Sequence, residues 1–580
     1  SSGAWSGGLT LTAGKIILKS GLTVLNELNL VSGILNFEYQ TLELQRNILT
    51  NWPKGVLQAN ALSTLKITSA FAGMNNTLAF DPMLNTLGSL MLDRTANVLP
   101  ISGVVVSPHV TLNSPLLITR EFNIKDGEFY NQSGLALGAG AKIIRTPDGG
   151  FSAATTAVIK GGPYDLYYVK GINLNPMSAG IEAFGLIRNL SMNLPNTVSF
   201  KSPLTINNRL EIFQGTADLR YLTKADTVMN KSVLLSSPEL RIVSNFNNSG
   251  LFTNRSGLVS FTGSGFITGT VIPEFYNLTI SGSLSAPSEI SVAGDLMNDG
   301  VFNPNSGTVV LAGNSKQKIG GASRLDFYNL LVSNRSDTVS IQTPVSIIGT
   351  LDVAPGAIFN AGNILLQLAY KDVNHQGKIG VLEPTAKILG QLSMQRFVPG
   401  SVRGYRYLSS PLAGFTIGGL YGYFPFDPFY FFSYDESVTG NKTAGFYRPD
   451  FSEQMRPGRG FVFWPTGQDA FNGINWTANG ELQTGVNRDV VNLNVMYTPT
   501  AGGSYENDGW NLLGNPYPSP IKWSADVLAW SDDKNAKFRG IDPVVFVWDN
   551  KTGNYQTWNA LTGMGDLSES TGVIASGQAF

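Results

Sequence analysis

The sequence predicts an all-β protein in which a parallel β-solenoid is followed by a β-sandwich-like domain made of two related halves. Three observations support this prediction. Apolar residues alternate with strand periodicity in a recurring pattern, turn-forming residues interrupt that pattern at short intervals, and a different, aromatic unit occurs twice nearer the C-terminus. We place the solenoid at 1–385, with loops or excursions at 55–100 and 150–195, and the duplicated domain at 386–580.

One apolar pattern occurs four times without gaps. Its copies are 16–33, 110–127, 198–215 and 339–356. A proline stands at the turn position of the last three copies, where its fixed φ and missing N–H suit a corner. Every copy ends on a glycine, as expected where the backbone needs a positive φ. Three short strands joined by corners describe one turn of a solenoid.

A second repeat indicates that such turns are stacked. Residues 248–263 match 298–313, and residues 275–281 match 327–333, at nearly constant offsets. A regular period is expected when each turn buries its apolar side only against its neighbours. A string of β-sandwich domains would also contain short alternating strands. The unequal spacing of the four copies favours the solenoid, because single turns can be inserted into a stack.

The unit that occurs twice after residue 385 begins with a strand that ends in proline. The segment 403–414 (RGYRYLSSPLAG) shares an aromatic residue, a leucine, a small residue and a proline with 508–519 (DGWNLLGNPYPS). Downstream, 429–447 and 544–558 each contain aromatic strands joined through an Asp-to-Gly turn, which is typical of a β-hairpin. The prolines end one strand and direct the chain into a long connection, because X-Pro bonds favour extended or turn geometry.

The third part of the unit relates 456–464 to 575–580. A full strand follows Gly460 in the first copy, whereas the second copy stops shortly after Gly577. A strand cut off midway would leave backbone groups without partners. We therefore expect the natural polypeptide to continue beyond Phe580.

Composition excludes several classes of function. Forty basic and 41 acidic residues give a net charge of −1, so no basic excess is present to bind nucleic acid. The absence of cysteine excludes disulfides, thiolate catalysis and Cys-ligated zinc. No apolar run is long enough for a membrane-spanning helix. The first residues lack an initiator Met and the features of a signal peptide, so we expect that a leader has been removed or that the segment begins within a longer protein.

The sequence contains little that indicates catalysis, and we predict that the protein is not an enzyme. A Ser-His-Asp arrangement would have to use His109 or His375, the two histidines, and His109 is interpreted as a solvated turn residue. A polysaccharide-cleaving β-helix would need clustered carboxylates. The solenoid acids are sparse and lie at dissimilar positions of the repeat: Asp126, Glu211, Asp295, Asp299 and Asp352.

Calcium is the one metal considered, and no cofactor is predicted. Oxygen ligands occur at Asp532 and Asp533, and in the segment from Asp549 to Gly553. The second segment lacks the alternating acidic pattern of a calcium loop, and Lys551 stands where a ligand should be. A hairpin turn is the favoured interpretation.

Tryptophan is concentrated in the second domain and has two interpretations. Most of these residues occupy alternating strand positions, as around Trp548, where one face packs into a core. Alternatively, they could present flat faces to sugar rings. The candidates for such a glycan contact are Trp464, Trp476, Trp510, Trp523 and Trp558.

Several of these motifs resemble secreted and surface proteins of Bacteroidota that are exported by the type IX secretion system. The resemblance rests on GWNLLGNPYPSPIKW (509–523), VFVWDNKTGNYQTW (545–558), SGQAF (576–580), RFVPGSVRGYRYLSSP (396–411), FYNLTISGS (275–283) and ISVAGDLMNDGVFN (290–303). It implies a signal peptide, passenger domains and a C-terminal sorting domain. It also implies partnership with the type IX translocon and cell-surface attachment machinery. Two Asp-Thr-Val triplets fit the O-glycosylation pattern of this group, with Thr227 and Thr338 as acceptors.

Taken together, these observations predict an extracellular protein on the outside of the outer membrane. We expect a structural or adhesin-like display stalk that acts through contact with glycans or other surface proteins. The alternative is a glycan-binding or polysaccharide-degrading protein. Trp-to-Ala changes that abolish retention on polysaccharides would favour the alternative, as would turnover of a glycan that depends on a solenoid carboxylate.

Overall fold

The computed structural model is nearly all β, with 55% strand and 3% helix, and contains a parallel β-solenoid of about 17 turns. It divides into two compact units, 1–285 and 286–580, which are described separately below. The residues described are 3–68, 76–94, 97–98, 105–106, 109–152, 158–372, 374–400, 404–423, 426–466, 472–482, 495–524, 541–566 and 572–580. The predicted fold class is confirmed.

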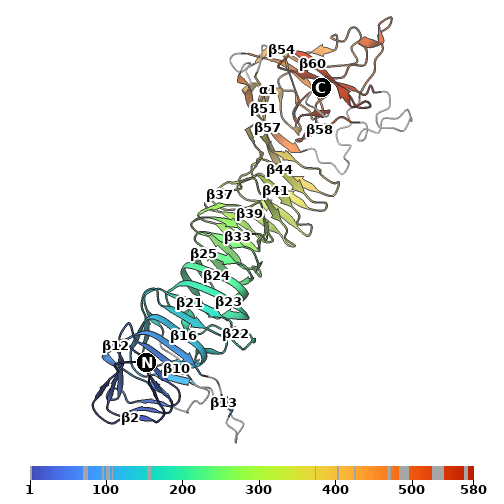
Figure 1. Ribbon diagram of the computed structural model, residues 1–580. Helices are drawn as coiled ribbons and strands as arrows, with labels where there is room; N and C mark the ends of the chain where they lie inside the picture. Colours follow the sequence, from blue (N-terminus) through green and yellow to red (C-terminus); the bar gives the residue numbers. More distant parts are fainter. Residues whose placement is uncertain are drawn as a thin grey trace. The chain divides into compact units, whose positions relative to one another are not determined.

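The first unit consists mainly of parallel strands stacked turn upon turn (Figure 1). The stack is clearest along β21 (Tyr164–Val169), β23 (Ile187–Phe200), β24 (Leu204–Leu219), β25 (Thr223–Asn230) and β28 (Phe246–Asn248). Their register superimposes one apolar side chain per turn, and each is fully buried: Leu166, Leu190, Leu210, Val228 and Phe246. Each such side chain contributes about 1.5–3 kcal/mol when removed from water.

The four-copy repeat corresponds to equivalent turns. In the last copy the three short strands are β42 (Thr338–Ile341), β43 (Val345–Ile347) and β44 (Thr350–Val353). The closing glycines of three copies have positive φ values of 95°, 84° and 82°, at Gly127, Gly215 and Gly356 respectively, as predicted. Gly33 differs: an added Cβ would lie 2.5 Å from the Cβ of Leu11, so close packing between turns explains this glycine.

The two segments expected to be loops belong largely to the stack. In 55–100, β10 (Thr64–Thr68) pairs in parallel with β12 (Phe80–Asp93). In 150–195, β21 pairs in parallel with β23. The expectation of loops is therefore wrong for these strands. It holds for the segment between β22 (Met177–Ser178) and β23, which contains the 3-10 turn η1 (Ile181–Ala183).

Buried amides continue the ladder inside the first unit. The Asn230 side chain donates to the Asn248 side-chain oxygen at 2.8 Å, and Asn248 donates in turn to the carbonyl of Val271 at 3.1 Å. Both asparagines are fully buried. Because their polar atoms find partners on adjacent turns, these side chains do not incur the cost of burial without hydrogen bonds.

In the second unit the solenoid gives way to antiparallel sheets at β51 (Gln391–Val398). One edge of β51 is parallel to β46 (Leu366–Leu368), with Leu366 opposite Leu392. Its other edge is antiparallel to β57 (Ile474–Leu482). The change occurs within a few residues of the boundary placed at 385.

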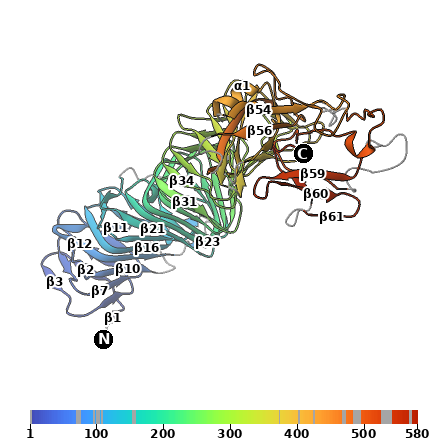
Figure 2. The ribbon, with the colours of Figure 1, turned by 90° about the horizontal axis from the view of Figure 1, so that it is seen from above.

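Two related sheets follow. The first contains β52 (Arg406–Leu408), β56 (Phe461–Pro465), β54 (Phe426–Tyr434) and β55 (Phe446–Tyr447). The second contains β59 (Val544–Asp549), β60 (Asn554–Asn559) and β61 (Met564–Gly565), which lie side by side in Figure 2. Both predicted hairpins are present, because β54 is antiparallel to β55 and β59 is antiparallel to β60.

The two halves also exchange equivalent hydrogen bonds. The Ser409 N–H donates to the carbonyl of Gly577, and the Gly514 N–H donates to the carbonyl of Gly458, both at 2.9 Å. Ser409 and Gly514 are equivalent in the sequence repeat. Gly458 and Gly577 share a positive φ, 85° and 78°. The equivalent of Gly577 is thus Gly458, in agreement with the alignment of 456–464 with 575–580.

Candidate functional site

Three of the solenoid carboxylates are engaged in local structure. Glu211 accepts a hydrogen bond from Arg209 at 2.9 Å. Asp295 accepts from the Lys318 N–H at 2.9 Å, and Asp299 accepts from the Ala322 N–H at 2.8 Å. A fourth, Asp352, lies in β44, where burial raises the pKa of its carboxyl group.

Asp126 belongs to a row of acids that the sequence did not reveal. The strand register places it opposite Asp93, and the pairing of Gly127 with Gly149 brings Asp148 to the adjacent turn. Burial and the nearby charges of Asp148 and Asp93 raise the pKa of Asp126 to about 6. A carboxyl group with such a pKa can donate a proton near neutral pH. Sequence analysis missed the row because the acids come from three turns of unequal length.

The neighbours of Asp126 have other partners. Asp93 forms an ion pair with Lys125 at 2.9 Å. Asp148 accepts hydrogen bonds from the N–H groups of Ile172 and Asn173 at 2.6 and 2.9 Å, which hold the loop after β21. The row therefore also has a structural role.

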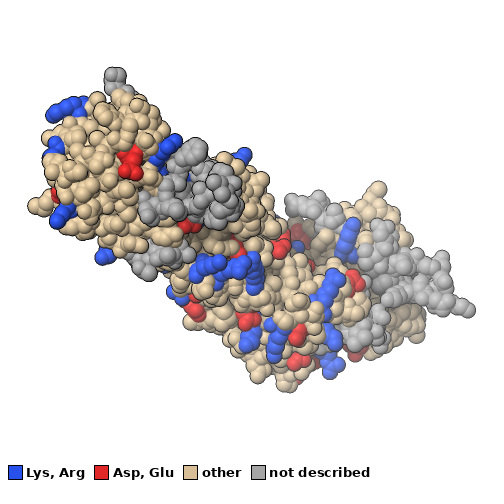
Figure 3. Space-filling view, turned by 90° about the horizontal axis from the view of Figure 1, so that it is seen from below, with Lys and Arg blue, Asp and Glu red and all other residues tan. Residues whose placement is uncertain are grey.

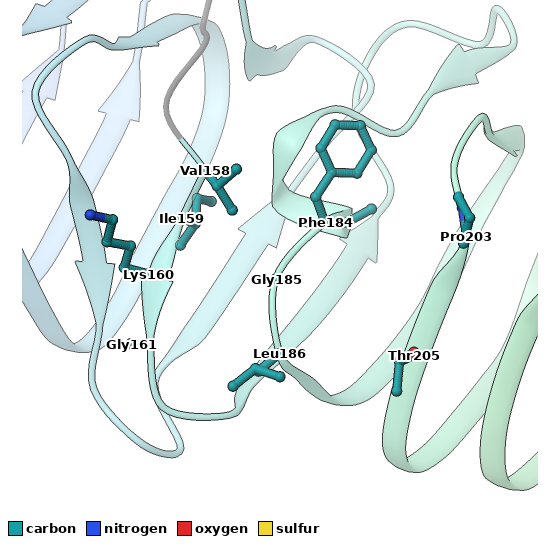
Figure 4. A pocket seen from close by; sticks show the side chains of 10 residues that line it. Val158, Ile159, Lys160, Gly161, Phe184, Gly185, Leu186, Pro203 and Thr205 are labelled. Atoms are coloured by element: carbon teal, nitrogen blue, oxygen red, sulfur yellow. The ribbon is translucent and has the colours of Figure 1, made fainter.

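A hollow of about 450 Å³ lies on the surface of the first unit (Figure 4). Val158 and Ile159 line it from one segment, Phe184 and Leu186 from another, and Lys160 is the one charged residue among its ten lining residues. Val158, Phe184 and Leu186 are themselves exposed. The hollow thus presents mainly apolar surface and backbone.

Next to this hollow, a buried ion pair fixes the η1 turn. The fully buried Glu182 pairs with Arg145 and accepts a hydrogen bond from the Tyr168 hydroxyl at 3.0 Å. The Tyr164 hydroxyl donates to the Glu182 carbonyl at 2.6 Å. Burial, followed by the charge of Glu182, raises the pKa of both tyrosines. These bonds hold the turn against the stack.

The two histidines lie in different parts of the solenoid. His109 begins β15 (His109–Leu112) and its ring centroid is 5.1 Å from that of Tyr130. It is half-buried in a strand, so its interpretation as a solvated turn residue is wrong. His375 is 2.7 Å from the Asp372 carboxylate through Nδ1, and this contact lowers the pKa of Asp372.

Of the two calcium candidates, Asp532 and Asp533 lie outside the described residues. The Asp549 carboxylate accepts hydrogen bonds from the Lys551 N–H and the Thr552 hydroxyl at 2.8 and 2.9 Å, which confirms the hairpin turn. In the described part of the chain, no group of three or more His, Cys, Asp or Glu side chains could hold a metal ion.

Both predicted glycosylation acceptors lie in solenoid strands. Thr227 is in β25 and Thr338 begins β42, and both are half-buried. The Thr338 N–H donates to Asp337 Oδ1 at 2.7 Å. Their modification stays a prediction.

The candidate tryptophans differ in how they are packed. Trp476 is only 1% exposed and packs against Phe415 with centroids 5.7 Å apart, which leaves its indole no free face for a ligand. Trp523 and Trp558 pack on the core of the second half. Trp510 packs edge-on against Phe546. Trp464 is the candidate that lies on an outer sheet face.

That outer face belongs to the sheet of the first half. Strand alternation directs Arg406, Phe463 and Phe431 inward, where all three are buried. Their neighbours Tyr405, Trp464 and Tyr430 therefore form a row on the opposite side. The Trp464 ring lies 5.0 Å from that of Tyr405 and 6.3 Å from that of Tyr430, centroid to centroid.

A second row adds a cation to the rings. The Arg448 guanidinium lies 5.2 Å from the centroid of Phe429 and 5.7 Å from that of Phe432, within the range of cation–π attraction. Arg448 Nε also donates to the Phe429 carbonyl at 2.9 Å. We call the set of six side chains the aromatic face: Tyr405, Phe429, Tyr430, Phe432, Arg448 and Trp464.

Half of the aromatic face is open to solvent, whereas Tyr405, Phe432 and Trp464 are half-buried. Phe429 is 66% exposed and Tyr430 is 48% exposed, and Arg448 is exposed as well. Burial and the neighbouring Tyr430 raise the pKa of Tyr405. Sequence analysis found Trp464 but missed its companions, because it weighed tryptophan alone. The alternating run FYFFSY in β54 was the signal that could have revealed them.

Comparison with known proteins gives a match to a protein-family model. Residues 304–580 match the model of a family described as a domain of unknown function (DUF8693). The match includes the whole aromatic face. No curated protein and no solved structure matches the chain. Among the described helices, none has the length and apolar character needed to cross a membrane.

Proposed function

We propose that this chain is a secreted protein that acts as a display stalk on the cell surface and is exported by the type IX secretion system. The solenoid would supply a stiff support, and the function would consist of contact with other molecules rather than catalysis. The proposal on export rests on the resemblance of the repeat and hairpin motifs to secreted Bacteroidota proteins.

The observation that best supports a supporting role is the uninterrupted apolar ladder of the first unit. Its buried side chains lie directly above one another from β21 to β28. A stack of this kind gains about 4.8 Å for each added turn and keeps the same interior. A longer stack can therefore hold a contact surface farther from the point of attachment, without any additional type of hydrophobic core.

The outer surface is compatible with contact to varied partners. Acidic and basic side chains both occur along the face in Figure 3. Several charges pair across the solenoid surface, as where Asp218 accepts from both Arg220 and Arg255. Such paired charges favour solubility over attraction to a polyanion.

Labelling of intact cells tests the proposal. In the bacterium that encodes the chain, a membrane-impermeant biotin reagent should label the protein. A strain that lacks a type IX translocon component should retain it unlabelled, while an unrelated outer-membrane protein stays labelled in both strains. A protein that is never labelled on intact cells, or that is labelled equally in both strains, would contradict surface display or this export route respectively.

A second candidate function, polysaccharide degradation, is favoured by Asp126 alone. A carboxyl group with a pKa of about 6 beside two further acids resembles the arrangement of a general acid near an ionised partner. Turnover of a polysaccharide by the purified chain, lost in Asp126→Asn, would support it. No release of reducing ends from any polysaccharide tested would favour the display function.

A further inference from the structure

We propose that the second half of the duplicated domain contains an acceptor site for one further β-strand, along the free edge of β59. The occupant is an extended polypeptide segment with the apolar alternation of β56, and it enters the site beside Phe580. The inference goes beyond the proposed display function and does not depend on it, because it rests on the comparison of the two halves.

The first half shows the sheet with its central strand in place. Strand β56 lies between β52 and β54 and is antiparallel to both, with Phe461 opposite Leu408 and Phe463 opposite Phe431. All four of these side chains are buried. The central strand therefore closes the core of this half.

The second half contains the two flanking segments of the same sheet. Aligned on the proline-ending strand and on the aspartate of the hairpin turn, Tyr405 is equivalent to Trp510 and Phe432 to Phe546. The rings of Tyr405 and Phe432 lie 6.4 Å apart, centroid to centroid, and those of Trp510 and Phe546 lie 5.0 Å apart. The equivalent flanking segments are thus brought together in both halves.

One edge of β59 is free in the described part of the chain. Strand β59 is the outermost strand of its sheet and pairs with β60. The Ala560 N–H donates to the Pro543 carbonyl at 3.0 Å, so alternate residues counted from Pro543 bond to β60. The backbone N–H and C=O of Phe546 therefore point to the other edge. Such an edge selects an extended polypeptide, because a β-strand carries matching donors and acceptors at the same spacing.

Phe580 fixes the point of entry and the direction of the added strand. Phe580 and Leu513 exchange both backbone hydrogen bonds at 2.9 Å, and they are equivalent to the paired residues Phe461 and Leu408 of the first half. The Phe580 ring also packs on the core that contains the valines of β59. Because Phe580 already takes the position of the first residue of β56, a segment joined to Phe580 is favoured over a separate peptide.

The burial of equivalent residues selects an apolar strand over a polar one. Leu513 and Phe580 are half-buried, whereas their equivalents Leu408 and Phe461 are 1% and 0% exposed. Phe463 of β56 is fully buried in the first half. An apolar side chain at the equivalent position would remove further apolar surface of the second half from water, which is favourable.

An extended chain tests the proposal. Val-Phe-Trp-Pro, the sequence of 462–465, is appended after Phe580, and hydrogen exchange is measured by mass spectrometry with fragmentation to single residues. The appended valine should lie opposite Phe546, as Val462 lies opposite Phe432. We expect the Phe546 amide to exchange about tenfold more slowly than in the original chain, because it becomes hydrogen-bonded. The Phe432 amide, which already faces β56, should not change.

An extension of the same length provides a matched control. Val-Asp-Trp-Pro places an aspartate at the position equivalent to Phe463, which is fully buried in the first half. Burial of an unpaired carboxylate is strongly unfavourable, so this extension should leave the exchange of the Phe546 amide as it is in the original chain. Both extensions lie outside the existing sheets, so neither removes a contact on which the folded chain depends.

Three results would overturn the inference. They are unchanged exchange of the Phe546 amide in the chain extended by Val-Phe-Trp-Pro, equal protection by both extensions, and protection by a free peptide with the sequence of 460–466 but not by the appended strand. The last result would assign the edge to a separate partner. Failure of the intact-cell labelling would refute surface display but leave these exchange rates unaffected, so the two proposals fail separately.

Discussion

Two buried or half-buried acids of the first unit illustrate how local surroundings decide the role of a charge. Glu182 is fully buried but has Arg145 and the Tyr168 hydroxyl as partners, so these contacts hold the η1 turn against the stack. Asp126 is half-buried beside two like charges, and its pKa is raised to about 6. Its ionised form is therefore disfavoured in the folded chain.

This difference predicts a pH-dependent effect of Asp126→Asn. Because the folded pKa of Asp126 exceeds its unfolded value near 3.8, the stability it contributes is full below the unfolded pKa and is lost as the pH rises through 6. Asp126→Asn should raise stability at pH 7 by about 1 kcal/mol, after allowance for solvent screening, and have little effect near pH 4. Thermal unfolding at both pH values measures this. An equal effect at both values would contradict the assigned pKa.

At the scale of single residues, the sequence predicted only some of the residues in the candidate site. Trp464 could be selected because tryptophan is rare and its sheet position alternates, and the structure places it on an outer face. The companions Phe429 and Tyr430 could not be separated from core residues, because β54 is aromatic on both sides. The Asp93, Asp126 and Asp148 row depends on registers between turns of unequal length, which one sequence does not fix.

At the scale of elements, the prolines and glycines of the second unit hold the two halves together. Asn515 is buried and lies in the chain between Gly514, which donates to Gly458, and the prolines. Its side-chain amide donates to the carbonyls of Ser519 and Ala575 at 2.9 and 3.1 Å. Pro518 in turn accepts from Arg396 of β51 at 3.2 Å. The proline-rich turn after the strand thus contacts both the last solenoid strand and the C-terminal segment.

Gly577→Ala tests this exchange of hydrogen bonds. An added Cβ has room, with its nearest neighbours at 3.5 Å, but the φ of 78° is unfavourable for alanine. We expect a loss of about 1–2 kcal/mol in the stability of the C-terminal region, and a similar loss for Gly458→Ala. Denaturant unfolding followed by tryptophan fluorescence measures it, since seven of the nine tryptophans lie in 464–558.

Gly553 supplies the control for this prediction. It has a φ of 68° in the exposed β59–β60 turn, with nothing near an added Cβ. Gly553→Ala carries a similar backbone strain but touches neither half-to-half bond. A fluorescence transition that shifts for Gly553→Ala and not for Gly577→Ala would contradict a role for the exchange.

At the scale of the whole molecule, the solenoid follows from one repeated requirement: each turn must bury its apolar side chains against the adjacent turns. The alternating apolar pattern was sufficient to predict the fold class. It failed in 55–100 and 150–195, where the strands are regular in pairing but their sequence contains turn residues that resemble loops. In β12 the register shifts twice against β16, which explains why no clear repeat could be seen there.

A core substitution in one turn of such a stack should destabilise that turn and its neighbours but not distant turns. Leu210→Ala removes a fully buried side chain between Leu190 and Val228 and should cost about 2–5 kcal/mol. Hydrogen exchange followed by mass spectrometry should show lost protection in β23, β24 and β25, with the sheet of 404–466 unaffected, because turns interact only with neighbours. Leu251→Ala, at a 59% exposed position of the same unit, should change little. Uniform loss of protection throughout the first unit would contradict the stacked, quasi-one-dimensional fold.

The central claim is the proposal that the protein acts by displaying a contact surface. Adhesion of living cells to surfaces coated with glycans or with proteins tests it most directly. Cells that carry the chain should adhere to at least one such surface, and cells from which the chain is deleted should lose that adhesion. Adhesion that persists when the chain is deleted would contradict the account.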